Sequence, residues 1–282
     1  MRTLEILTFV TLLGSLIALL LIRKGPRWFN YLPGFTLVIV LCHVVFEGVR
    51  WQMIPAYVFI SVLFLISLKQ FIGTKKEQSK RPAIFKRILR ISGTVITFIL
   101  FVIILIPPLE VPMFRIPHPT GKFKVGSSIL FFRDTARIDA FSPEKNRFRE
   151  LSVRVWYPAS PGNQEKRMPF MQRDEARYQA IYSNGAAFVL SHFKLIKTDS
   201  YLNAEPIKGI FPVIFYSPSG SIVDNTTLLQ ELASHGYIVF SIGHPYWNAF
   251  YYDEQAQVKP LDADNTHYKS LWVEENSSEV IK

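Results

Sequence analysis

The stretches FPVIFYSPSG, residues 211–220, and LQELASHGYIVFSIGHPY, residues 229–246, decide the fold of the second half of this chain. Residues 212–216 and 237–242 are short apolar runs, typical of buried strands of a parallel sheet. Residues 226–235 between them have helical spacing. A capping box from Thr227 to Gln230 would start this helix, and Gly236 suits the left-handed position after it. Strand, loop, helix and strand predict a βαβ unit.

A hairpin is predicted upstream of this unit. Residues 127–132 read as one strand, and residues 151–157 alternate apolar and polar side chains, as a half-buried strand does. A polar loop joins the two as an antiparallel pair. Residues 165–197 read as partly helical. A hairpin with two parallel strands buries little surface, and the last strand of the unit would then be an exposed edge.

The first half of the chain contains four long apolar runs, at residues 4–22, 32–49, 53–71 and 91–107. Each approaches the ~20 residues that a helix needs to cross a bilayer. Pro107 and Pro108 are expected to end the fourth helix, since proline cannot continue one. A secretory signal peptide is the alternative for the first run. The basic segment that follows, residues 23–27, contains no small-residue cleavage site and favours a retained helix.

Loop charge predicts the orientation of these helices. The first and third loops are basic, with Arg23, Lys24 and Arg27 in one and the run 75–90 in the other, whereas the second holds only Arg50. Basic loops stay cytoplasmic. Both termini and the C-terminal domain are therefore expected outside the cytoplasm, in an integral protein of the cell membrane.

Charge and cysteine content exclude several classes of partner. The net charge of +10 gathers mainly in the run between two apolar segments, which favours membrane lipid head groups and not nucleic acid. The single cysteine, Cys42, permits no disulfide within the chain, and no Cys/His spacing suggests a metal. No metal and no cofactor are expected.

His43 and Glu47 lie four residues apart on one face of the second apolar run. Ionisable groups at membrane depth are costly and invite a functional interpretation. The alternative is structural: Glu47 lies near the interface beside Arg50, and His43 bonds a neighbouring helix. The structural interpretation is preferred, and the sequence leaves the role of the pair open.

Several segments together resemble a known family. The stretches quoted at the outset, with VGSS at 125–128, DTAR at 134–137 and VWYP at 155–158, are similar to the platelet-activating factor acetylhydrolase branch of the α/β-hydrolases. The resemblance covers residues 121–252. The apolar runs predict an α-helical membrane region of four transmembrane helices (1–108), followed by a Pro-rich connector (109–120). The resemblance implies that the rest is the N-terminal part of an α/β-hydrolase domain (121–282). That domain would be incomplete, an antiparallel hairpin plus one βαβ unit.

The resemblance also implies site residues. The loop after the first parallel strand supplies one backbone N–H of the oxyanion hole, which makes Ser219 and Gly220 the candidates. The family usually has His-Gly in this loop, where this chain has Pro218 and Ser219, and proline has no N–H to donate. The family's nucleophile motif is Gly-x-Ser-x-Gly, and no serine of this chain has glycine at both flanking positions. No catalytic residue is therefore assigned.

Two functions remain open at this stage. One is a membrane-anchored serine carboxylester hydrolase of lipase or esterase type, truncated before its nucleophile and inactive as given, with an acyl-ester substrate implied by the resemblance alone. The other is a complete, non-catalytic membrane protein that binds a ligand or partner. His235 and His244 precede any expected nucleophile, against the family order of Ser, Asp and His, so neither is assigned as a base. The sequence does not determine the oligomeric state.

Overall fold

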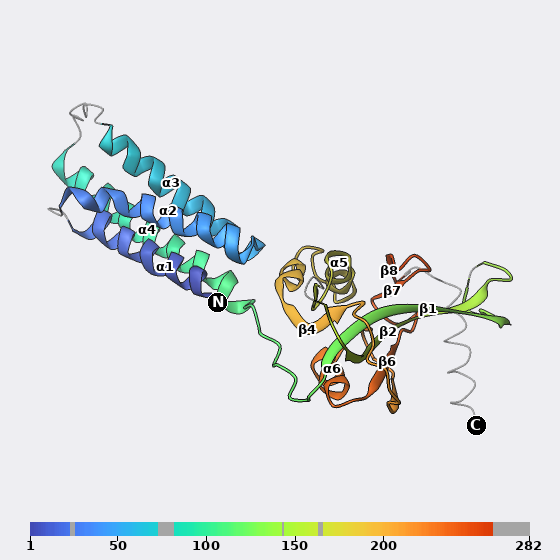
Figure 1. Ribbon diagram of the computed structural model, residues 1–282. Helices are drawn as coiled ribbons and strands as arrows, with labels where there is room; N and C mark the ends of the chain where they lie inside the picture. The colour runs from blue at the N-terminus through green and yellow to red at the C-terminus, as the bar shows by residue number, and fades with distance from the viewer. Residues whose placement is uncertain (23–25, 73–81, 143, 163–165, 262–282) are drawn as a thin grey trace, which may run out of the picture. The chain divides into compact units, whose positions relative to one another are not determined.

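A computed structural model describes residues 1–22, 26–72, 82–142, 144–162 and 166–261 of the chain. The chain divides into two compact units, Met1–Met113 and Phe114–Lys282. The first is helical and the second contains a twisted sheet with helices beside it (Figure 1). The basic residues at 23–24 and 75–81, which the orientation argument uses, lie outside the described residues.

The first unit consists of four long helices. Their bounds are α1 at Thr3–Leu16 with a π-helical turn at Ile17–Leu21, α2 at Leu32–Cys42 with a π-helical turn at His43–Glu47, α3 at Ile54–Phe71, and α4 at Ala83–Glu110. Short 3-10 turns at Arg27–Tyr31 and Trp51–Met53 lead into α2 and α3. The four segments Thr3–Leu21, Trp28–Glu47, Trp51–Lys69 and Arg87–Glu110 are each long and apolar enough to cross a membrane.

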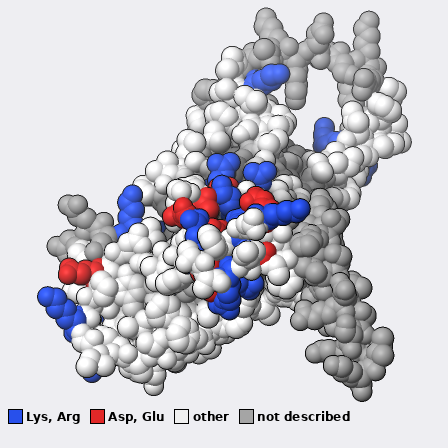
Figure 2. Space-filling model, turned by 90° about the vertical axis from the view of Figure 1, so that its right-hand side faces the viewer, with Lys and Arg blue, Asp and Glu red and all other residues white. Residues whose placement is uncertain are grey.

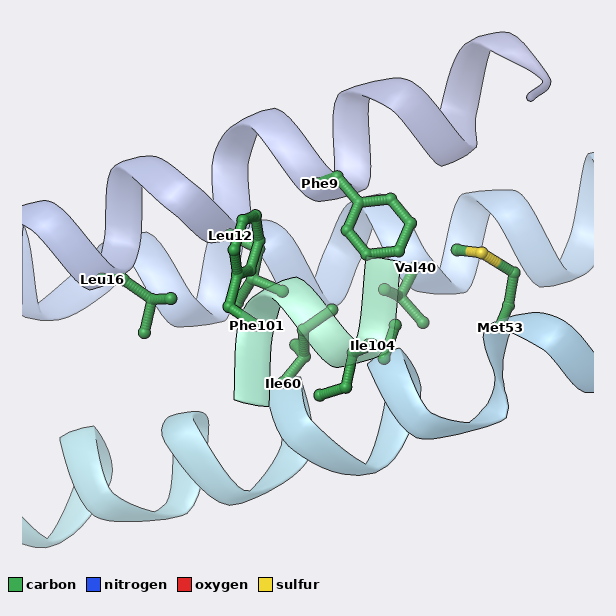
Figure 3. Close-up of a cluster of buried hydrophobic side chains, with 9 residues drawn as sticks. Phe9, Leu12, Leu16, Val40, Met53, Ile60, Phe101 and Ile104 are labelled. Atoms are coloured by element: carbon green, nitrogen blue, oxygen red, sulfur yellow. The ribbon is translucent and has the colours of Figure 1, made fainter. Parts of the chain in front are cut away.

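Apolar side chains from all four helices meet in the core of this unit. Figure 3 shows Phe9, Leu12 and Leu16 of α1 beside side chains of the other three helices. The outward faces are apolar as well, with Ile6, Val10 and many similar residues exposed. A helix that is apolar all round suits a hydrocarbon solvent, since its outer face has no polar side to turn toward water. Length, composition and exposed apolar faces together agree with a membrane region.

The end of α4 corrects the expectation that Pro107 and Pro108 stop the helix. The helix continues to Glu110, where the Val111 N–H donates to the Pro107 carbonyl. Arg50 explains why the last turn survives without the proline donors. Its buried guanidinium donates to the carbonyls of Pro108 (3.2 Å) and Val111 (3.3 Å). A cation at a helix C-terminus also interacts favourably with the helix dipole.

The second unit is built on a six-stranded sheet in the order β3-β4-β1-β2-β6-β5. The strands are β1 at Lys124–Ile138, β2 at Phe148–Ala159, β3 at Arg167–Pro169, β4 at Lys197–Leu202, β5 at Val213–Tyr216 and β6 at Ile238–Ile242. β1 and β2 pair antiparallel, as the predicted hairpin requires. β3 and β4 were not predicted. The hairpin and βαβ unit are therefore parts of a larger sheet, and β6 is not the edge, since it lies between β2 and β5.

The predicted βαβ unit is present. β5 and β6 are adjacent and parallel, with Val213 opposite Ile238, and α6 (Thr226–Ser234) joins them. Gly236 has φ +97°, as expected after the helix. The predicted capping box is not formed, because the N-cap is Asn225, two residues before Thr227, in the left-handed conformation. Gln230 is instead buried and donates to the Pro117 carbonyl.

The β2 strand is buried on both faces, which corrects the half-buried prediction. Val153 and Val155 on one face are 4% and 5% exposed, and Arg154 and Trp156 on the other are 0% exposed. The alternation identified the strand correctly. Its polar face is covered because β2 lies in the middle of the sheet, where other parts of the unit pack over both faces.

Smaller elements complete the unit. The region at 165–197, predicted as partly helical, contains α5 (Arg173–Tyr182) and a 3-10 turn at Ser191–Leu195. After β6, a small antiparallel pair forms from β7 (Phe250–Tyr252) and β8 (Val258–Pro260). Its buried side chains, with Ile222 and Val223, form one apolar cluster with residues at the start of α5. This cluster holds the loop after β5 in place.

Candidate active site

Two loops meet where β5 and β6 end. The loop after β5 starts at Ser217, and the loop after β6 starts at Gly243. The two loops begin at the same edge of the sheet, because Tyr216 and Ser241 are opposite each other in the parallel register. The carboxyl ends of adjacent parallel strands are where open α/β sheets bind ligands. The two loops line one pocket of about 500 Å³, with Arg149 and Phe141 on its other side.

A serine and a histidine pair at the mouth of this pocket. The Ser217 hydroxyl lies 2.8 Å from Nε2 of His244. The His244 backbone N–H donates to the Asn248 side chain at 2.6 Å, which fixes the start of the second loop. Within the described residues, no carboxylate bonds the other ring nitrogen of His244. The arrangement is thus a hydroxyl with an adjacent base, without the acid that would orient that base.

The two predicted oxyanion donors differ in their surroundings. The Gly220 N–H donates to the Asp224 carboxylate at 3.0 Å, and the Ser221 N–H donates to the same oxygen at 2.8 Å. The Ser219 N–H donates to no acceptor in the described part of the chain, and Ser219 is exposed along the pocket. An unengaged N–H is available to a ligand oxygen, whereas an engaged one must first leave its acceptor. Ser219 is therefore the better placed of the two candidates, whereas sequence reasoning favours Gly220.

Arg149 reaches the pocket because of the sheet register. β2 and β6 are antiparallel, with Val153 opposite Ile242, so the first residues of β2 lie beyond the carboxyl end of β6. Burial, and secondly the charge of Arg149, lower the pKa of His244 below its ordinary value. The imidazole is therefore neutral at pH 7 and able to accept a proton.

A second, more enclosed cavity of about 310 Å³ lies on the other side of Tyr246. Its charges already pair with one another: Arg147 lies 2.9 Å from Glu150, and Lys259 lies 3.3 Å from Asp253. Figure 2, which views the molecule from the side where β1 and β2 turn, shows acidic and basic residues interleaved there. The interleaving agrees with these pairs, which occupy the basic residues of the cavity lining.

The first unit holds a buried polar cluster at one end of its helices. Glu5 and His43 are 0% exposed, and His43 bonds Tyr57 of α3 at 3.0 Å, as the structural interpretation of His43 predicted. Arg50 pairs with Glu5 at 3.0 Å, and Glu47 pairs instead with Arg2 at 3.4 Å. Arg50 therefore has Glu5 as its ion-pair partner, and the carboxylate of Glu47 pairs with Arg2.

The same cluster contains three groups that could in principle hold a metal ion, from Glu5, His43 and Glu47. Arg2 already occupies the space between them: its guanidinium lies 2.9 Å from Glu5 and 3.0 Å from Nε2 of His43. Two arginines balance the two carboxylates, so an added divalent cation would leave a net buried charge, which is costly. The cluster fits a structural ion network better than a metal site.

Sequence reasoning missed Ser217, Arg149 and Asp224. Arg149 gave no signal, because its place depends on the pairing of β2 with β6. Ser217 lay within the loop already singled out, and only the position of His244 shows that it has a partner. Asp224 follows Gly220 by four residues, a spacing at which a side chain can accept from the backbone of its own turn.

Comparisons with known proteins give few matches. No protein-family model matches the chain, and no curated protein matches it. Among solved structures, a ferulic acid esterase from Streptomyces cinnamoneus is similar, with 24% sequence identity and a TM-score of 0.45. The match covers 54% of this chain and 42% of that chain, so this chain spans less than half of the esterase. A likeness at this level carries no argument about function.

Proposed function

We propose that this chain is part of a membrane-anchored carboxylic ester hydrolase of the serine class. In this proposal it supplies the ligand pocket and one oxyanion donor but not the nucleophile, and it does not turn esters over as given. The observation that carries the proposal is the meeting of the loops after β5 and β6 around one pocket, with the Ser219 N–H unengaged by any acceptor among the described residues. No metal or cofactor has a part in this chemistry.

Acyl transfer in this class needs a nucleophile, a base oriented by an acid, and donors for the developing oxyanion. The Ser219 N–H meets the last requirement in part. Ser217 and His244 resemble the first two, at 2.8 Å, but within the described residues no acid orients the histidine. The Gly-x-Ser-x-Gly motif is absent from the sequence. The proposal therefore assigns binding to this chain and expects no catalysis from it.

The anchor in this proposal is the four-helix unit. Its four apolar segments are long enough to span a bilayer, and lipid would cover their exposed apolar side chains. The basic loops would face the cytoplasm and contact anionic lipid head groups, which places the pocket outside the cytoplasm. A hydrolase held there would meet acyl esters at or near the membrane surface.

An assay of the purified full chain tests the absence of turnover. The chain in detergent micelles is incubated with short-chain nitrophenyl esters, and we expect the rate of empty micelles. Turnover that survives in Ser219→Ala and disappears in Ser217→Ala would contradict the proposal and would identify Ser217 as a nucleophile. Loss in both variants would also contradict it and would assign the activity to the loop as a whole.

The missing nucleophile has its own test. We expect the coding region that follows the codon for Lys282 to encode a Gly-x-Ser-x-Gly motif, in frame or shifted by one or two nucleotides. A region without such a motif would favour the alternative, a non-catalytic domain that binds a ligand or partner. One observation supports that alternative: Asp224 engages both the Gly220 and Ser221 N–H groups, so neither is available to an oxyanion.

A further inference from the structure

We propose that the pocket beside Ser217 and His244 recognises the carboxylate of a small amphipathic acid, with Arg149 as the recognition residue. The inference rests on the proposed function and names the class of acid in the ester substrate. The acid that ester hydrolysis releases has an apolar body and one carboxylate. The pocket lining is complementary to both, with aromatic side chains and one arginine.

Arg149 is the charged group of the pocket with unused donors. Its side chain is 35% exposed, and its closest acid, Asp139, lies 3.9 Å from its terminal nitrogen, beyond hydrogen-bond distance. Within the described part of the chain, the Arg149 side chain donates no hydrogen bond. A guanidinium presents parallel N–H donors that match a carboxylate in a two-point contact. An arginine in this state therefore favours a planar anion over a neutral ligand.

Asp139 pairs with this charge only loosely, at 3.9 Å, and accepts no hydrogen bond from it. Its carboxylate is 5% exposed and accepts hydrogen bonds from the Tyr246 hydroxyl at 2.8 Å and the Phe141 N–H at 3.1 Å. Burial and the bond to Asp139 raise the pKa of Tyr246, which keeps its hydroxyl protonated and donating. Asp139 is thus held by neutral donors, and Arg149, which lines the pocket, keeps its N–H donors available to a ligand.

The rest of the lining explains the apolar half of the ligand. The rings of Phe141 and Tyr246 lie 5.8 Å apart between centroids and form one wall, and Trp247 is 49% exposed. Aromatic walls favour an aromatic or short alkyl body. The unengaged Ser219 N–H lies on the same pocket and gives the carboxylate a second donor. A cation, one amide donor and aromatic walls together define a small aryl or alkyl carboxylate.

Calorimetric titration of the full chain in detergent micelles tests this assignment. The probes are 3-phenylpropanoate, the neutral 3-phenyl-1-propanol and phenyl phosphate, each also titrated into micelles without protein. We expect 3-phenylpropanoate to bind most tightly. Arg149→Gln should weaken its binding by about tenfold to a hundredfold, the range for losing hydrogen bonds to a charged group. Arg137→Gln is the control, since Arg137 is 73% exposed and pairs with Asp134.

Three outcomes would overturn the inference. They are equal binding of the alcohol and the carboxylate, tighter binding of phenyl phosphate, and unchanged binding in Arg149→Gln. Arg149→Lys keeps the positive charge but not the two-point geometry, so it should lose only part of the affinity for 3-phenylpropanoate. This second variant keeps the inference testable if Arg149→Gln does not fold. The titration measures binding and the nitrophenyl ester assay measures turnover. Failure of carboxylate binding therefore does not decide the proposed function, and turnover by the chain does not decide the role of Arg149.

Discussion

Single polar residues connect elements in both units of this molecule. Arg50 connects the helices of the first unit: it pairs with Glu5 of α1 and donates to two carbonyls at the end of α4. His43 bonds Tyr57 of α3 in the same cluster. In the second unit, His244 is held by Ser217 and by its own backbone bond to Asn248. Each residue serves elements that are distant in the sequence.

Arg50→Met should destabilise the first unit. Breaking a buried ion pair costs about 3–5 kcal/mol, and the lower end is expected because Arg2 still pairs with Glu5 at 2.9 Å. Denaturation of the detergent-solubilised chain, followed by circular dichroism, measures the change. Arg90→Met, at an exposed position, is the control. Equal stability of the two variants would show that the cluster does not support the helices.

His244 should make stability depend on pH. Burial first, and then Arg149, lower its folded pKa below the ordinary 6.5, so the unfolded chain binds the proton more readily. The stabilising contribution is complete above the unfolded pKa and is lost as the pH falls through the folded pKa. We expect wild type to lose more stability than His244→Gln between about pH 7.5 and about pH 5. Parallel curves for the two proteins would remove His244 as the source.

At the scale of elements, the βαβ unit positions the pocket. α6 covers one face of β2 and β6 through Leu229 and Ala233, which are buried with Trp156 and Val239. The helix ends through Gly236, whose left-handed backbone turns the chain into β6. The register between β5 and β6 then sets where the two pocket loops begin. The geometry of the site is thus a consequence of a helix end and a strand pairing.

Gly236→Ala should therefore destabilise the second unit. A non-glycine residue in this conformation costs about 1–2 kcal/mol, and its Cβ would lie 3.2 Å from the Phe123 ring. Gly209→Ala is the matched control, because Gly209 does not have a positive φ and its new Cβ would also lie 3.2 Å from a phenylalanine ring, that of Phe211. Thermal unfolding measures both. A loss in Gly209→Ala as large as in Gly236→Ala would argue against backbone strain as the cause.

At the scale of the whole molecule, the chain joins an apolar helical unit to a polar α/β unit. The first has exposed apolar side chains on every long helix. In the second, ion pairs such as Arg133 with Glu150 lie on the surface. The two surfaces suit different solvents, hydrocarbon for the helices and water for the sheet. This contrast favours a membrane anchor with a domain outside the bilayer.

Reporter fusions test which side of the membrane that domain occupies. A reporter that is active only in the cytoplasm should be inactive after Tyr252 and active after residue 78, because the third loop is basic and the second is not. Alkaline phosphatase, which is active only outside, should show the reverse pattern at the same two positions. Cytoplasmic activity at both positions, or the inverted pattern, would contradict the proposed orientation.

The sequence by itself determined the features that depend on local pattern. Four apolar runs, the β1–β2 hairpin and the βαβ unit follow from hydrophobic period and turn residues, which near neighbours in the chain decide. Local reasoning was wrong where a distant residue intervenes. Pro107 and Pro108 stay within α4, whose last carbonyls Arg50 binds, and β2 is covered on both faces by other parts of the unit.

Only the tertiary structure decided the site. Arg149 is far from Ser217 and His244 in the sequence, and antiparallel pairing of β2 with β6 carries it to the end of β6. The loop after β5 was predictable, but the pairing of Ser217 with His244 was not. The physical reason is the same in both cases: strand order and register depend on the packing of the whole sheet, and a side chain's partners follow from that packing.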